Sequence, residues 1–387
     1  MRRAVIITGV IGIGCVLIGA LFFYVRASST VPPRVEASLQ YTSGEVAAPS
    51  VQPTPIPVAK HILTPEPVHA IYMTGWVAGL KDWRSDLISF VENSNLNAMV
   101  IDVKDFSGRI SFKTDDPDIH ALGAEEDRIP DIKGLINELH QKNIYVIARI
   151  STFQDPYFAT KHAEAAIHRK NGSLWADKKG IRWLDPSSHE VWNYVVRIGK
   201  AAERVGFDEL NYDYVRFPSD GDLSAMVFSE YDGKRPKSDV LEDFFTYLHD
   251  NLQVTHIPIS VDLFGLTTER TDDMGIGQIL EKAARHVDYV APMTYPSHYP
   301  PGYRGLEDPN NHPYEILKGA LDVAVKRMVA ASTSPNKIRP WIQDFDLGVH
   351  YTVDMIKEEI RGVNDAGLTS WMVWDPKNKY TRAAYTK

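Results

Sequence analysis

FDELNYDYVRFP, residues 207–218, has the pattern of a buried β-strand that ends in a polar loop. Pro218 ends the run, because proline cannot donate a hydrogen bond to a neighbouring strand. The strand-favouring apolar residues are Phe207, Leu210 and Tyr212. The segment therefore predicts a strand in the interior of a sheet.

The opposite face of this strand is unusually polar. Side chains alternate between the two faces of a strand, and the polar set is Glu209, Asn211 and Asp213. A buried carboxylate is unfavourable unless it is paired, hydrogen-bonded or functional. Asp213 thus either forms a structural ion pair, for which Arg216 is the candidate, or carries chemistry at the end of the strand.

Similar strands recur along the chain and alternate with helix-period segments. The other strand candidates are 69–76, 97–105, 144–151, 258–265, 287–295, 338–345 and 369–375. The helix candidates are 82–92, 131–141 with Asp131 as N-cap, 190–205, 239–253, 275–286, 313–329 and 353–365. This order predicts an α/β fold, a (β/α)8 TIM barrel with enlarged βα loops. A doubly wound sheet is the alternative, but no glycine-rich phosphate loop follows the first strand.

The N-terminal region differs in composition from the rest of the chain. Residues 4–25 are apolar and uncharged, long enough for a transmembrane helix, and Arg2 and Arg3 before them favour a cytoplasmic N-terminus. Cleavage as a signal segment is the alternative, since Val25 and Ala27 have a spacing that signal peptidase accepts.

We therefore divide the chain into a membrane anchor or signal segment (1–26), a linker rich in Pro, Ser and Thr (27–67) and a barrel domain (68–387). This division predicts a single-pass membrane protein with an extracytoplasmic domain, or a secreted protein if the segment is cleaved. The cytoplasmic membrane is accordingly one expected partner.

Charge and cysteine content exclude several functions. The net charge is -8 and basic residues do not cluster beyond the N-terminus, which disfavours nucleic-acid binding. Cys15 is the single cysteine, so neither an intrachain disulfide nor a cysteine metal site can form. Nucleotide and zinc-protease motifs are absent, and His298 and His312 are weak metal candidates. We expect no cofactor.

Polar residues follow most of the expected strands, where the ends of barrel strands converge on one face. Each could separately be a helix cap or a turn former. The set is Asp102, Lys104, Arg149, Asp213, Arg216, Asp262, Tyr295, Asp344 and Asp375. Convergence of so many polar ends favours a binding or catalytic site.

Several carboxylates in one cleft suit glycoside hydrolysis, in which one carboxylic acid protonates the leaving oxygen and a second carboxylate attacks or activates water. Asp213 and Asp262 lie on neighbouring strands and are the expected pair. Asp262, near Phe264, is the better candidate for a raised pKa, and Asp344 is expected to stabilise charge or to serve as the alternative partner. The cations expected to keep Asp213 ionised are Lys104, Arg149 and Arg216.

Aromatic residues near the strand ends suit the flat faces of sugars. Tyr295 and Tyr299 lie in an expected loop and are predicted to face a ligand, as is Trp374. For Trp341 and Trp371, by contrast, a place in the barrel core is the favoured interpretation.

Several motifs resemble those of a bacterial family of inferred glycoside hydrolases, a domain of unknown function related to the α-amylase-like TIM-barrel glycosidases. The similar segments are VIDVKDFSG (100–108), YVIARISTFQDP (145–156), WLDP (183–186), GFDELNYDYVRFPS (206–219), SVDLFG (260–265), APMTYPSHY (291–299) and RPWIQDF (339–345).

The resemblance implies roles for three of these residues. By position in the barrel, Asp213 matches the nucleophile, Asp262 the general acid and Asp344 a stabilising carboxylate. The chain departs from the superfamily in having Asn211 where an arginine is usual, and Asp rather than Glu at position 262.

Together these features predict a membrane-tethered glycoside hydrolase that acts on an envelope or extracellular polysaccharide through two carboxylates. A non-catalytic carbohydrate-binding barrel in envelope assembly is one alternative. The other is a metal-dependent polysaccharide deacetylase, with His298 or His312 as a ligand.

Overall fold

The computed structural model describes residues 60–387. The expected membrane segment at 4–25 and most of the linker at 27–67 therefore lie outside the described residues. Within 60–387, no helix has the length and apolar character needed to cross a membrane.

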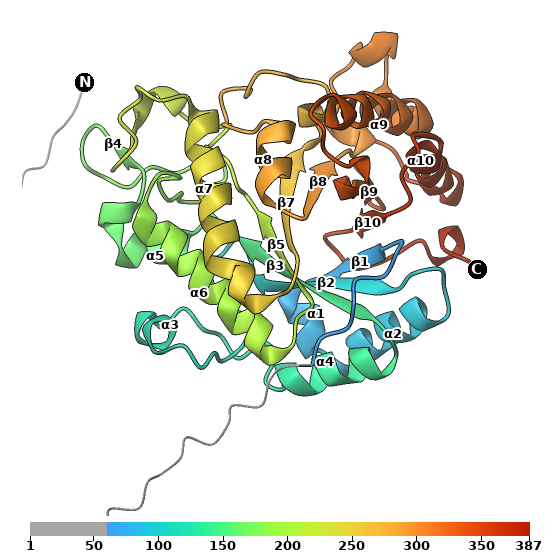
Figure 1. Ribbon diagram of the computed structural model, residues 1–387, viewed down its shortest axis with the longest axis horizontal. Helices are drawn as coiled ribbons and strands as arrows, with labels where there is room; N and C mark the ends of the chain where they lie inside the picture. The colour runs from blue at the N-terminus through green and yellow to red at the C-terminus, as the bar shows by residue number, and fades with distance from the viewer. Residues whose placement is uncertain (1–59) are drawn as a thin grey trace, which may run out of the picture. The chain divides into compact units, whose positions relative to one another are not determined.

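Eight parallel strands form a closed barrel (Figure 1). They are β1 His69–Met73, β2 Ala98–Lys104, β3 Tyr145–Ser151, β5 Glu209–Asp213, β7 Ile259–Phe264, β8 Tyr289–Met293, β9 Trp341–Gln343 and β10 Trp371–Trp374. Each pairs with the next along the chain, and β10 pairs with β1 to close the cylinder. The predicted (β/α)8 architecture is thus confirmed, and an open doubly wound sheet is excluded.

Helices surround the barrel (Figure 1). The longer ones are α2 Lys81–Glu92, α4 Ile132–Gln141, α6 His189–Val205, α7 Lys237–Leu252, α8 Leu280–His286, α9 Pro313–Ala330 and α10 Val353–Asp365. Asp131 caps α4 as predicted, since its Oδ1 accepts a hydrogen bond from Gly134 N at 2.9 Å. Helix α8 begins five residues later than expected, because Gly275 and Gly277 adopt positive φ angles of 70° and 87° that a helix cannot contain.

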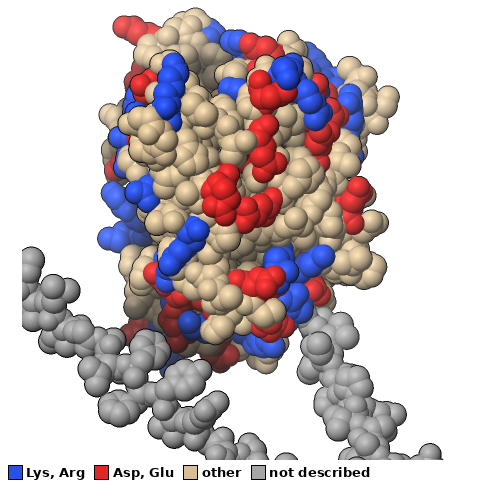
Figure 2. All heavy atoms as spheres, turned by 90° about the vertical axis from the view of Figure 1, so that its left-hand side faces the viewer, with Lys and Arg blue, Asp and Glu red and all other residues tan. Residues whose placement is uncertain are grey.

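The long segment after β3 forms a small lobe that sequence periodicity did not predict. It contains α5 Pro156–Lys161 and the short strand β4 His168–Arg169, which pairs antiparallel with β6 Met226–Val227 from the loop after β5. Trp175 Nε1 also donates to the Asp222 carbonyl at 2.8 Å. Figure 2 shows this side of the molecule, where Lys and Arg lie among Asp and Glu. Two-residue strands carry no readable period, which explains the omission.

A buried ion pair lies inside the barrel, below the polar end. Arg339 Nη1 donates to both oxygens of Glu209 at 2.9 and 2.8 Å, and Ser260 Oγ donates to Oε1 at 2.7 Å. Both side chains are nearly inaccessible to solvent. The polar face expected for β5 thus points into the barrel.

We expect Arg339→Met to lower the free energy of unfolding by about 3–5 kcal/mol, because it leaves the Glu209 carboxylate buried without its cation. Urea denaturation would measure the change. The double variant with Glu209→Gln should recover much of the loss. A single variant within about 1 kcal/mol of the wild type would contradict a structural role for the pair.

Candidate active site

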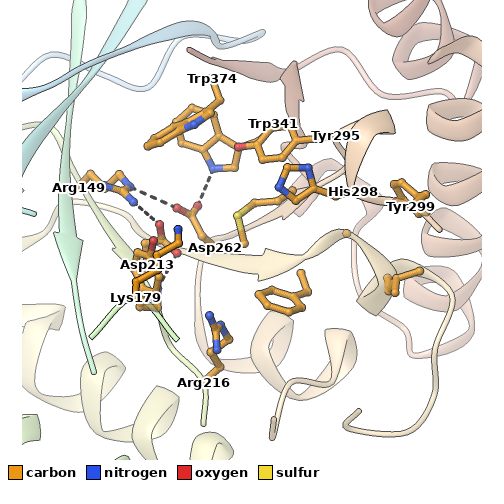
Figure 3. Close-up of a pocket in the computed structure, with 15 residues that line it drawn as sticks. Arg149, Lys179, Asp213, Arg216, Asp262, Tyr295, His298, Tyr299, Trp341 and Trp374 are labelled. Atoms are coloured by element: carbon orange, nitrogen blue, oxygen red, sulfur yellow. Dashed lines mark hydrogen bonds and ion pairs between the residues drawn. The ribbon is translucent and has the colours of Figure 1, made fainter. Parts of the chain in front are cut away.

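A cavity of about 480 Å³ opens where the strands end (Figure 3). Its walls come from β3, β5, β7, β8, β9 and β10 and from the loops that follow them. The lining residues are Arg149, Lys179, Asp213, Tyr214, Arg216, Asp262, Phe264, Gly265, Leu266, Met293, Tyr295, His298, Tyr299, Trp341 and Trp374. The structure thus brings Asp213 and Asp262 into one hollow, together with six of the other residues that the strand-end and aromatic patterns singled out.

Arg149 on β3 connects the carboxylates of three neighbouring strands. Its Nη1 donates to Asp102 Oδ1 at 2.6 Å, its Nη2 donates to Asp213 Oδ2, and its Nε lies 3.9 Å from Asp262 Oδ2. Burial disfavours the charge on Arg149, but Asp213 and Asp102 outweigh that effect and raise its pKa. The guanidinium is therefore a permanent cation between the two candidate catalytic carboxyls.

Asp213 is held in place by the turn that follows β5. Its Oδ1 accepts a hydrogen bond from Tyr214 N at 2.5 Å, while Oδ2 faces Arg149. Tyr214 itself has a φ of 55°, a left-handed conformation that a bulky residue rarely adopts. Strained backbone of this kind is frequent beside functional groups. The turn and the ion pair together fix the Asp213 side chain at the cavity wall.

Asp262 sits in a different environment, although it belongs to the neighbouring strand. Its exposed fraction is 2%, and its Oδ1 accepts hydrogen bonds from Asn211 Nδ2 at 3.0 Å and Trp341 Nε1 at 2.7 Å. Burial, followed by the nearby charge of Asp213, raises the pKa of Asp262 to about 8. The carboxyl is therefore mostly protonated at neutral pH. Because Oδ1 already accepts two hydrogen bonds, Oδ2 is the atom left to carry the proton.

The Trp341 hydrogen bond offers a way to change this pKa without removing the carboxyl. The indole N–H stabilises the charged form of Asp262, so we expect Trp341→Phe to raise the pKa further. The high-pH limb of the pH–rate profile should then shift to higher pH, and kcat should fall by about tenfold or less. A pH–rate profile checks this, and an unchanged or lowered limb in a folded variant would contradict the assignment.

An aromatic wall faces the carboxyl pair (Figure 3). Trp374 stacks on Tyr72 with ring centroids 3.9 Å apart and meets Trp341 edge-on at 5.6 Å. The predicted placement of Tyr295, Tyr299 and Trp374 toward a ligand agrees with their place in the lining. Trp341 belongs to the barrel core as predicted, and it also lines the cavity and donates a hydrogen bond to Asp262, a role that the core interpretation left out. Trp371 does pack in the hydrophobic core.

Some predicted site residues lie outside the cavity lining. Asp344 accepts hydrogen bonds from Thr381 N at 2.9 Å and Thr381 Oγ1 at 2.7 Å, and from the Tyr385 hydroxyl at 2.9 Å, so its carboxylate anchors the C-terminal segment. Asp375 accepts hydrogen bonds from the backbone N–H groups of Lys377 and Lys379. It therefore forms a turn, which was the structural alternative for the polar residues at strand ends. Neither carboxyl is placed with the Asp213–Asp262 pair.

Two of the three cations expected around Asp213 have other partners. Lys104 is fully buried and pairs with Asp155 at 2.8 Å. Arg216 lines the cavity, but its Nη1 donates to the Phe217 carbonyl and to Ser219 Oγ rather than to Asp213. Arg149 is the cation that binds Asp213, and Asp102 supports it from behind without lining the cavity.

Sequence reasoning missed other residues that belong to the site. Asn211 holds Asp262, and Lys179 reaches the cavity from the lobe after β3. The sequence did contain an indication for Asn211, since side-chain alternation places it on the same strand face as Asp213. Lys179 had none, because its loop has no periodic pattern.

The two histidines considered as metal ligands lie in different parts of the structure. His298 lines the cavity and burial lowers its pKa, whereas His312 lies at the N-terminus of α9. Among residues 60–387, one group of three potential ligand side chains has atoms within 4.8 Å of one another. It consists of His162, Glu164 and Glu190, and so includes neither predicted histidine.

Comparison with known proteins adds a family match. Residues 70–380 match the family described as "Putative glycosyl hydrolase domain". No curated protein matches the sequence. A hypothetical protein from Ruminiclostridium thermocellum ATCC 27405 is 30% identical, with 50% of this chain and 96% of that chain covered and a TM-score of 0.46.

Two further solved structures are similar in fold. The PgaB (BpsB) glycoside hydrolase domain from Bordetella bronchiseptica is 12% identical, with 83% of this chain and 98% of that chain covered and a TM-score of 0.57. Alpha-L-fucosidase isoenzyme 2 from Paenibacillus thiaminolyticus is 14% identical, with 82% of this chain and 47% of that chain covered and a TM-score of 0.56. At these identities the likeness establishes the shared barrel.

Proposed function

The chain belongs to the family described as "Putative glycosyl hydrolase domain", and from this premise we propose that it cleaves a polysaccharide of the cell envelope or exterior through Asp213 and Asp262. The glycoside hydrolase class follows from the family. The substrate and the catalytic roles are our proposal.

One observation carries the proposal, namely that two carboxyls share one arginine in one cavity, where Asp213 pairs with the guanidinium directly and the pKa of Asp262 is raised. Asp213 binds Arg149 directly, and Asp262 lies 3.9 Å from the same guanidinium with its pKa raised to about 8. Glycosidases need such a pair, because one group must give a proton while the other acts as an anion. A purely structural ion pair would not need the second, protonated acid.

Asp262 acts as the general acid in this proposal. Its Oδ2 proton passes to the glycosidic oxygen while the bond from that oxygen to the anomeric carbon breaks. Asn211 and Trp341 stabilise the carboxylate that remains, through the hydrogen bonds they already make to Oδ1.

Asp213 acts on the anomeric carbon. Asp213 pairs with the same guanidinium that Asp262 approaches, and we assign to it the nucleophile's role of a retaining enzyme, in which the two carboxyls lie roughly 5 Å apart. Asp213 then forms an ester with the anomeric carbon. Water attacks that ester, gives its proton back to Asp262, and releases the sugar and a free Asp213 carboxylate.

The proposed location comes from the N-terminal sequence. An apolar segment at 4–25 followed by a proline-rich linker would hold the barrel outside the cytoplasmic membrane, within reach of envelope glycans. The aromatic wall of Trp374, Trp341 and Tyr295 supports a sugar as the ligand, since ring faces bind the apolar faces of pyranoses. These two features fit a binding barrel as well, and it is the protonated Asp262 beside Asp213 that favours a hydrolase over a non-catalytic binding barrel.

The experiment that tests the function is release of new reducing ends from a panel of purified bacterial envelope polysaccharides. The full-length wild type should cleave at least one of them. The Asp213→Asn, Asp262→Asn double variant should bind the same glycan without cleaving it. Equal turnover by the wild type and a folded double variant would refute the assignment of the pair.

A further inference from the structure

Arg216 is a cation in the cavity wall whose charge the described residues leave without a direct partner. Its exposed fraction is 9%, and its guanidinium lies over the rings of Trp183 and Phe264, 4.7 and 4.6 Å from their centroids. The two rings hold the planar group in a fixed orientation. In Figure 3 it lies on the side of the carboxyl pair away from Trp374.

Only one of the three guanidinium nitrogens is used within residues 60–387. Nη1 donates to the Phe217 carbonyl at 3.1 Å and to Ser219 Oγ at 3.2 Å, and no Asp or Glu of this part of the chain forms an ion pair with Arg216. Nε and Nη2 share the other edge of the group. That edge presents two parallel N–H donors, the geometry that a carboxylate binds in a bidentate manner.

Nearby acids do not neutralise this cation by contact. Asp177 accepts hydrogen bonds from Trp183 Nε1 at 3.0 Å and Gln154 Nε2 at 3.1 Å, and Asp220 accepts from the Lys178 backbone at 3.1 Å. Burying an unpaired guanidinium is costly, and the fold retains it facing a cavity. Such a group is expected where a ligand brings the missing charge.

A second cation reaches the same cavity. Lys179 lies in the turn of the lobe after β3, is exposed to solvent, and lines the cavity with Arg216. Its long side chain can approach a ligand that Arg216 holds. The lobe thus brings positive charge to a cavity whose other cation, Arg149, is already shared by Asp102 and Asp213.

We propose that Arg216 forms a subsite for a carboxylate on the sugar, so that the substrate is an acidic polysaccharide containing uronic acid or another carboxyl-bearing residue. This proposal rests on the proposed function and specifies its substrate. A monoanionic carboxylate fits better than a phosphate monoester, because one buried guanidinium supplies one charge and the Asp213 carboxylate nearby would repel a dianion.

The test compares acidic polysaccharides with their carboxyl-reduced forms, in which each uronic acid becomes a neutral hexose with the same linkages. Hyaluronan, heparosan, alginate and polygalacturonate oligosaccharides and their reduced counterparts serve as probes, with affinity measured by calorimetry on the full-length Asp262→Asn protein. We expect at least one acidic oligosaccharide to bind about 10- to 100-fold more tightly than its reduced form.

Substitution at position 216 should remove this preference. Arg216→Met keeps an unbranched side chain against the two rings but loses the charge, and should bind the acidic and the reduced form equally. Arg216→Lys should retain part of the preference, since it keeps a charge without the bidentate edge. Arg361→Met is the matched control, because Arg361 also lies over a ring, that of Tyr314 at 4.0 Å, but lies outside the cavity lining.

Equal affinity of every acidic and reduced pair, absence of binding to all the acidic probes, or a preference that survives in Arg216→Met would each overturn the proposal. Failure of the proposed function gives a different result. Binding that depends on Arg216 without any turnover by the wild type would keep the subsite and reject the hydrolase. Cleavage of neutral glycans alone would keep the hydrolase and reject the subsite.

Discussion

Asp213→Asn is expected to lower kcat by on the order of 10⁴-fold, the scale seen when an enzyme loses a reacting group. An amide cannot attack the anomeric carbon, and it cannot balance the charge of Arg149 as the carboxylate does. The smaller Asp213→Gly variant should regain activity when azide is added, because the anion can occupy the vacated space and attack in place of the carboxylate. The product would then be a glycosyl azide of inverted configuration, which NMR identifies.

Asp375→Asn is the matched control for this variant. Asp375 also follows a barrel strand, but its oxygens accept hydrogen bonds from the Lys377 and Lys379 backbone and it lies outside the cavity lining. Its kcat should stay within about tenfold of the wild type. If Asp213→Asn retained wild-type kcat with an unchanged circular dichroism spectrum, Asp213 would not be the reacting carboxylate.

Asp262→Asn should lower kcat by about 10²- to 10⁴-fold on a natural glycan, the range that general acid catalysis supplies. The loss should be much smaller on a dinitrophenyl glycoside, because that leaving group departs without a proton. The wild-type rate should fall as pH rises through about 8, where Asp262 loses its proton, and the variant should lack that limb. An equal loss on both substrates would argue against an acid role.

The same substitution changes how stability depends on pH. The folded-state pKa of Asp262 is raised to about 8, above the ordinary value of about 3.9, so ionisation is unfavourable in the folded state. Wild-type stability therefore declines as pH rises from about 4 to about 8, and Asn removes this contribution. Relative to the wild type, the variant should gain melting temperature over that window, which also shows that its lost activity is not a folding defect.

The barrel fold and the meeting of Asp213 with Asp262 could be predicted from the sequence, for a simple physical reason. Parallel barrel strands bury both faces, so their apolar runs stand out, and their ends must converge. Asp213 and Asp262 follow adjacent strands, which is why their meeting in one cavity could be expected. Arg149 could be expected for the same reason.

The errors concern residues whose partners come from irregular segments. Lys104 was expected at Asp213 but pairs with Asp155 from the loop after β3. Asp344 was expected at the cavity but binds Thr381 and Tyr385 near the C-terminus. Loop conformation has no period in the sequence, so contacts made by loops could not be predicted from the pattern of strands and helices.

The central claim, that one cavity holds a protonated Asp262 beside the Asp213–Arg149 pair, can be tested without a substrate. Proteins labelled with ¹³C at the aspartate carboxyl carbon would be titrated by NMR, comparing the wild type with Asp262→Asn. We predict one carboxyl resonance that titrates near pH 8 in the wild type and is missing from the variant. A wild-type titration in which the Asp262 resonance shifts with its ordinary midpoint near pH 4 would contradict the account.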